Sequence, residues 1–102
     1  MLATLENASE RGAYALADLP TYVVNQAKLR MRVMIRGDER LQNRYAVIAV
    51  NPTRVSGVDY SGAMEFVDFL TSPAAQALIG DFGRAQYGIS LFVPLGGTPS
   101  VE

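Results

Sequence analysis

The segment Tyr45–Val50 limits the possible folds more than any other part of the chain. It is apolar at every position, so an extended strand built from it would need cover on both faces. Asn51 and Pro52 follow it, and the proline ends the strand because it has no N–H to donate to a neighbouring strand. A strand covered on both faces is typical of a sheet flanked by helices. The sequence therefore predicts an α/β fold with a short mixed sheet between helices.

Local patterns predict the elements around this strand. Helices are expected where apolar residues recur at helical spacing behind capping residues, in the ranges 2–11, 18–28, 59–70 and 72–82. Gly12 and Gly83 are natural stops, and Pro20 and Pro73 suit a first helical turn. Further strands are expected at 13–16, 30–36 and 89–93, the last of them as a short edge strand or an extended tail. Residues 96–99 are expected to form a frayed end.

The predicted core joins the helices to the central strand. Phe66, Val67 and Leu70 fall on one face of the helix that Asp59 is expected to cap. With Leu78 of the next helix, they are expected to be buried against Tyr45–Val50.

Composition excludes several classes of function. The chain has 102 residues, enough for one domain, and contains neither histidine nor cysteine. Histidine-dependent and thiol catalysis, thiolate zinc sites and disulfide frameworks are therefore excluded. A formal net charge of −1 disfavours nucleic acid as a partner. No nucleophile has a base beside it and the carboxylates are scattered, so we expect no enzyme, no metal site and no cofactor.

Three short motifs have ordinary explanations. The first residues carry no basic region followed by a long apolar run, so no signal peptide is expected in this chain. Arg36-Gly37-Asp38 spells an adhesion tripeptide, but it follows a predicted strand and reads as a turn. Gly96-Gly97 opens no helix and does not indicate a phosphate-binding loop.

One cluster is a candidate binding site. Tyr14, Asp18, Thr21 and Tyr22 fall at the end of a predicted strand and the first turn of a predicted helix. Backbone N–H groups and hydroxyls at such a corner can hold an anion without a charged side chain. The alternative is that Asp18 only caps the helix and both tyrosines pack.

Several stretches resemble the C-terminal part of the tungstate-binding proteins of ABC uptake systems. The resemblance is carried in order by Gly12–Asp18, Arg36–Pro52, Tyr60–Pro73 and Ala75–Gly83. The helix pair around Leu70-Thr71-Ser72-Pro73 is shared among periplasmic binding proteins, whereas the stretch Asn43–Pro52 is more particular to the tungstate group.

The resemblance implies a two-lobed receptor of the type II periplasmic-binding-protein class, of which residues 1–102 form a single incomplete domain. On this view, about 13–30 end the second lobe, 31–50 form hinge and return strands, and 59–83 are helices of the first lobe. It further implies a tetrahedral oxyanion ligand, tungstate or molybdate, an ABC permease as partner, and a periplasmic or extracellular location. The family's main anion-binding loops have no counterpart in this chain.

The candidate corner departs from the family pattern. The family usually has threonine where this chain has Ala15 and Ala17, and a basic residue where it has Leu19. Any contact with an anion would therefore depend on backbone N–H groups, Tyr14 or Thr21.

Two alternatives remain open. One is a molybdate or phosphate receptor; the other is a stand-alone, self-associating interaction module without a transport role. Uncovered sheet edges seek partners, so we expect a homo-oligomer, formed through the region 30–50.

Overall fold

The computed structural model describes residues 1–96, which fall into two compact units. Unit 1 comprises Met1–Arg44 and Gly83–Leu91, and unit 2 comprises Tyr45–Phe82 together with residues 92–96. The prediction of a frayed end at 96–99 lies almost entirely outside the described residues.

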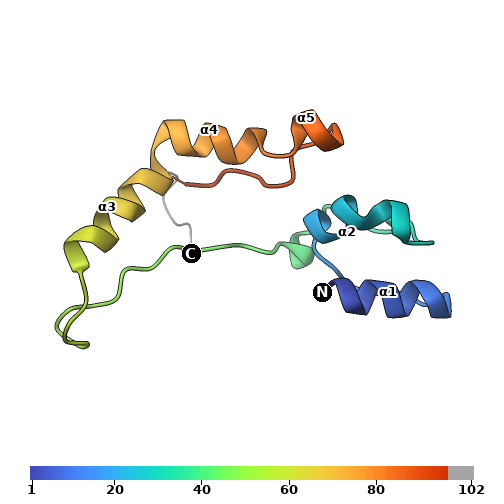
Figure 1. The fold of residues 1–102 in the computed structure, drawn as a ribbon, viewed down its shortest axis with the longest axis horizontal. Helices are drawn as coiled ribbons and strands as arrows, with labels where there is room; N and C mark the ends of the chain where they lie inside the picture. The colour runs from blue at the N-terminus through green and yellow to red at the C-terminus, as the bar shows by residue number, and fades with distance from the viewer. Residues whose placement is uncertain (97–102) are drawn as a thin grey trace. The chain divides into compact units, whose positions relative to one another are not determined.

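Unit 1 is built from short helices (Figure 1). They are α1 (Leu2–Arg11), α2 (Leu19–Asn25), α5 (Arg84–Tyr87) and the 3-10 turns η1 (Gln26–Lys28) and η2 (Glu39–Leu41). Helices α1 and α2 contact each other, and the Ser9 hydroxyl accepts a hydrogen bond from the Arg30 N–H at 2.8 Å. The buried apolar side chains of the unit are Leu5, Ala8, Val23, Leu29 and Leu91.

Two glycines fix the ends of helices in unit 1. Gly12 adopts a left-handed conformation with φ 63° and donates its N–H back to α1, which ends the helix. Gly83 has φ 91°, and a Cβ placed on it would lie 2.6 Å from the Cγ of Leu91. A larger residue at Gly83 would therefore disturb both the backbone and the packing of Leu91.

Unit 2 consists of α3 (Tyr60–Thr71) and α4 (Pro73–Asp81), joined at Ser72. The Gln76 side chain donates to the Leu70 carbonyl and accepts from the Gly96 N–H, each at 2.7 Å. The ring of Phe92 contacts Tyr45 edge-on at 6.1 Å and Phe82 at 6.0 Å between centroids. These contacts fasten residues 92–96 to α4 and to the start of the unit.

The helix predictions are confirmed with small shifts of their ends. Asp18 accepts from the Thr21 N–H, Asp59 from the Gly62 N–H and Ser72 from the Ala75 N–H, so each predicted capping residue caps its helix. Within residues 1–96, no helix is both long and apolar enough to cross a membrane.

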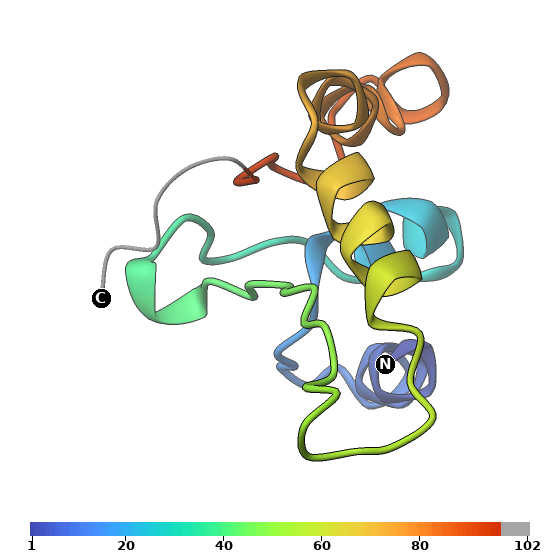
Figure 2. The ribbon, with the colours of Figure 1, turned by 90° about the vertical axis from the view of Figure 1, so that its left-hand side faces the viewer.

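The predicted sheet is wrong for the described residues. The ranges 13–16, 30–36, 45–50 and 89–93 contain no strand, and both views draw them as plain coil (Figures 1 and 2). Residues 1–96 are therefore α-helical with extended connections, not the α/β lobe with a short mixed sheet. The physical reason is that a strand exists only when a neighbouring strand pairs with its N–H and C=O groups along its length, and no such ladder forms among the described residues.

The predicted core fails for the same reason. Phe66 is 56% exposed and Leu78 is 69% exposed, while Val67 and Leu70 are half-buried. Among the described residues of unit 2, Ala75 alone is buried, at 3% exposure. The sequence predicts that the apolar stripe of α3 lies on a sheet; without that sheet, Phe66 is exposed and Val67 and Leu70 are only half-buried.

Candidate functional site

The predicted corner begins with Asp18, whose backbone is extended at φ −73° and ψ 150° immediately before α2. Its Oδ1 accepts a hydrogen bond from the Thr21 N–H at 2.8 Å. Hydrogen bonds from the side chain and then the backbone of Thr21 hold the pKa of Asp18 below its usual value. The start of α2 therefore already has an anionic group, supplied by the protein itself.

Thr21 and Tyr22 are tied into the local structure of unit 1. The Thr21 carbonyl accepts from the side-chain amide of Asn25 at 2.8 Å. The Tyr22 hydroxyl donates to the Met31 carbonyl at 3.1 Å, which links α2 to the extended segment that follows it. The Tyr22 hydroxyl thus has a structural partner, which agrees with the alternative that Tyr22 packs within the fold and does not bind an anion.

Tyr14 lies apart from these three residues. It is 89% exposed and forms no hydrogen bond with any described residue. The structure therefore brings Asp18, Thr21 and Tyr22 together, since the Tyr22 N–H also donates to the Asp18 carbonyl at 3.4 Å, but no hydrogen bond joins Tyr14 to them.

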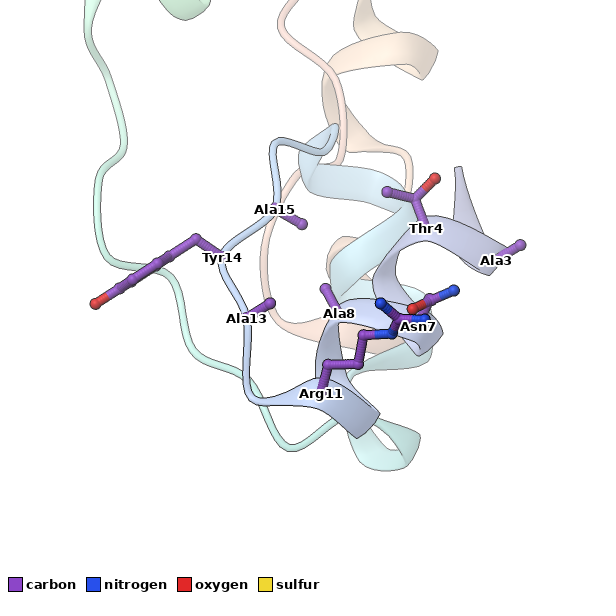
Figure 3. Close-up of a pocket in the computed structure, with 8 residues that line it drawn as sticks. All are labelled: Ala3, Thr4, Asn7, Ala8, Arg11, Ala13, Tyr14 and Ala15. Carbon is purple, nitrogen blue, oxygen red and sulfur yellow. The ribbon is translucent and has the colours of Figure 1, made fainter.

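Tyr14 instead lines an open hollow of 490 Å³ beside α1 (Figure 3). The polar residues around it are Thr4, Asn7 and Arg11, which fall three and four positions apart and so share one face of α1. In Figure 3 the Tyr14 ring points away from the other labelled side chains. The rest of the lining is Ala3, Ala8, Ala13 and Ala15.

Arg11 gives the hollow its positive charge. It lies in the last turn of α1 and forms no ion pair with a described residue. The Arg11 guanidinium, the Asn7 amide and the Thr4 hydroxyl are all groups that donate hydrogen bonds to an anion. The sequence reasoning missed Thr4, Asn7 and Arg11, although their spacing along the predicted 2–11 helix could have indicated a shared polar face.

The adhesion-like tripeptide is a structured turn. Asp38 caps η2 by accepting from the Arg40 N–H, and its carboxylate forms an ion pair with the Arg40 guanidinium at 2.8 Å. Arg40 thereby lowers the pKa of Asp38. Because both oxygens of Asp38 are engaged by Arg40, the carboxylate is not presented as a free ligand.

Within residues 1–96, no three carboxylates gather in a group that could hold a metal ion.

Comparison with known proteins identifies first a class and then a narrower group. Over 96 residues, the chain is 36% identical to a putative ABC transporter anion-binding protein of Haloferax volcanii, a match covering 89% of this chain and 28% of that protein. The class indicated is thus the anion-binding proteins of ABC transporters.

Two tungstate-binding proteins narrow the class. The chain is 39% identical over 90 residues to TupA of Peptoclostridium acidaminophilum, covering 88% of this chain and 32% of that protein. It is 35% identical over 86 residues to TupA of Campylobacter jejuni, covering 80% and 32%. The resemblance to tungstate-binding proteins is therefore confirmed: the chain is related to one stretch of them and spans about a third of their length.

No family model matches the chain, and no solved structure matches it.

Proposed function

We propose that the chain serves as part of the solute-binding component of an ABC uptake system for a tetrahedral oxyanion of the tungstate type. The observation that carries this proposal is the identity of 35–39% to three anion-binding proteins over most of this chain. An ABC permease is the partner, and the periplasm or the cell exterior is the place of action. The role is binding and delivery, not catalysis.

The chemistry of the ligand suits the groups that this chain offers. A fully ionised oxyanion only accepts hydrogen bonds, so N–H and O–H donors in a fixed arrangement recognise it. Within the candidate corner, Tyr14 is the proposed donor, because the side chain and the N–H of Thr21 already bond to Asp18. Asp18 and Tyr22 are positioning residues, because Asp18 orients the first turn of α2 and Tyr22 holds α2 to Met31. Arg11 adds a positive charge to the hollow that Tyr14 also lines, although the Tyr14 ring points away from the Arg11 side chain.

Tungstate is the proposed ligand and molybdate the nearest competitor. The two bear the same charge, as does sulfate, so a site separates sulfate from the larger ions by cavity size. The name of the H. volcanii relative specifies an anion but not which one, so molybdate and phosphate must be measured as alternative ligands.

A chimaera tests the proposal directly. The 90 matched residues of the P. acidaminophilum protein are replaced by the corresponding residues of this chain, and binding of tungstate, molybdate, phosphate and sulfate is measured by isothermal titration calorimetry. We expect tungstate to bind far more tightly than sulfate. A chimaera that melts cooperatively like its parent but binds none of the four anions would contradict the proposal.

Single substitutions in the chimaera test the residues. Tyr14→Phe removes the hydroxyl that is proposed to donate a hydrogen bond to the anion. Loss of a hydrogen bond to a charged group should weaken the binding free energy by about 1.5–3 kcal/mol, which is tenfold or more in affinity. Tyr60→Phe removes the same group from the start of α3, in the other unit, and is the matched control. Equal affinities for the parent chimaera and its Tyr14→Phe variant would show that the Tyr14 hydroxyl does not contact the anion.

A further inference from the structure

The segment 30–36 of unit 1 carries three arginines whose charge unit 1 does not neutralise. Arg30, Arg32 and Arg36 are all exposed, and none of them forms an ion pair with a carboxylate of unit 1. The segment contains no helix or strand, and the backbone is extended at Leu29 before it and at Asp38 after it. The guanidinium groups are therefore available to a partner that carries negative charge.

Positive charge is concentrated around this segment. Residues 28–44 contain six basic and two acidic residues, which leaves a formal charge of +4 in a chain whose net charge is −1. Of the two carboxylates, that of Asp38 is engaged by Arg40 at 2.8 Å. A local excess of this kind attracts an anionic surface although the whole chain is slightly acidic. A second copy of the segment would bring like charges together, so self-pairing at 30–36 is disfavoured.

Exposed apolar side chains lie between the arginines. Val33 is 47% exposed, Met34 61% and Ile35 74%. A purely acidic protein surface would pair with the guanidinium groups but would leave these apolar side chains in water. At the surface of an anionic bilayer, phosphate groups pair with guanidinium groups, while apolar side chains and the arginine stems enter the acyl boundary. The combination of charge and apolar area therefore favours lipid over an acidic protein.

We propose that the segment 30–36 binds the surface of a bilayer that contains anionic phospholipid. The segment has no regular structure to preserve, so it can follow a fluid headgroup layer without a fixed complementary shape. Each arginine near such a surface strengthens binding about fivefold, so the three together contribute about a hundredfold. The proposal does not depend on the oxyanion ligand, because none of the three arginines belongs to the candidate corner or lines the hollow beside α1.

Co-sedimentation of the 102-residue chain with vesicles tests the proposal. One set of vesicles contains equal parts of phosphatidylglycerol and phosphatidylcholine, and the other contains phosphatidylcholine alone. We expect binding to the first set only, and we expect it to be lost in about 1 M salt, where charges are screened beyond about 3 Å.

Substitution of single arginines locates the contact. Arg32→Gln should weaken vesicle binding about fivefold, and the triple replacement of Arg30, Arg32 and Arg36 by glutamine should weaken it about a hundredfold. Arg54→Gln is the matched control, because it removes the same charge from an exposed residue of unit 2 and should leave vesicle binding unchanged.

Two isoleucines separate a lipid partner from an acidic protein. Ile35→Ser removes an apolar side chain from between the arginines without changing the charge, and it should weaken vesicle binding severalfold. Ile48→Ser changes an isoleucine of similar exposure, 82%, in unit 2 and is the control. Circular dichroism should be unchanged in both variants, since neither residue lies in a helix.

Several results would overturn the proposal. They are an absence of binding to the anionic vesicles, equal binding to both sets of vesicles, binding that persists in high salt, and equal binding by the Arg32→Gln and Arg54→Gln variants. Poly-glutamate bound as tightly as the vesicles, with an affinity that Ile35→Ser does not lower, would assign the segment to an acidic protein instead. The same result with a DNA duplex would assign it to nucleic acid.

Discussion

Individual residues at helix starts set most of the local structure of this chain. Asp18, Asp59 and Ser72 each place a side-chain oxygen on an N–H of the first turn, and each was identified from sequence. Such bonds join residues three positions apart, so their partners are known from sequence order alone. A functional role at the same position is harder to predict, because an oxygen engaged in a cap is no longer free for a ligand.

Replacement of Asp18 measures its capping role. Asp18→Ala leaves the Thr21 N–H without its acceptor and is expected to lower the free energy of unfolding of unit 1 by about 0.5–2 kcal/mol. Asp18→Ser, which restores an acceptor, should recover most of the loss. Urea titration followed by circular dichroism gives both values, and equal losses for the two variants would contradict the capping role.

The lowered pKa of Asp18 also predicts a pH dependence. A carboxyl whose pKa is depressed in the folded state contributes stability above its unfolded pKa, near 3.8, and that stability is lost as the pH falls through the folded pKa. Helical content should therefore fall with acidification below about pH 4. Asp18→Asn removes this titration, so its helical signal should depend less on pH than that of the parent; parallel profiles would show that Asp18 does not contribute.

At the scale of elements, the helices could be predicted and the sheet could not. A helix satisfies its backbone within its own segment, and caps such as Asp59 and stops such as Gly12 mark its ends. A strand needs a partner distant in sequence, and the alternation of 30–36 or the apolar run of 45–50 does not say where that partner lies. The candidate corner was predicted in part for the same reason: Asp18–Thr21 is local, whereas the placement of Tyr14 depends on tertiary structure.

Burial predicts which truncations matter within the elements. Leu5 of α1 is 3% exposed, so Leu5→Ala should cost about 2–5 kcal/mol. Leu78 of α4 is 69% exposed, so Leu78→Ala should change stability by less than about 1 kcal/mol. Denaturant titration of monomeric protein gives both changes in the free energy of unfolding. A large loss for Leu78→Ala would show that Leu78 is packed, as the sequence predicts.

At the scale of the whole molecule, a chain that spans about a third of its tungstate-binding relatives is expected to recognise the proposed oxyanion only weakly. The chain spans about 32% of the two tungstate-binding relatives, and its candidate donors lie at one corner and one open hollow of unit 1. An ion held on one side remains in contact with water, where the high dielectric constant weakens each interaction severalfold. Closure of a second surface over the ion would supply the missing donors and the preorganisation.

The chain alone should therefore bind tungstate or molybdate no more tightly than about millimolar. Donors at a helix start contribute about 0.3–2 kcal/mol at an exposed site, whereas micromolar binding requires about 8 kcal/mol. One of those donors, the Thr21 N–H, is already bonded to Asp18. Isothermal titration of tungstate into the isolated chain, and separately into the chimaera, gives the two affinities to be compared. Micromolar binding by the isolated chain would mean that a complete site lies within these residues and that donors outside them are not needed.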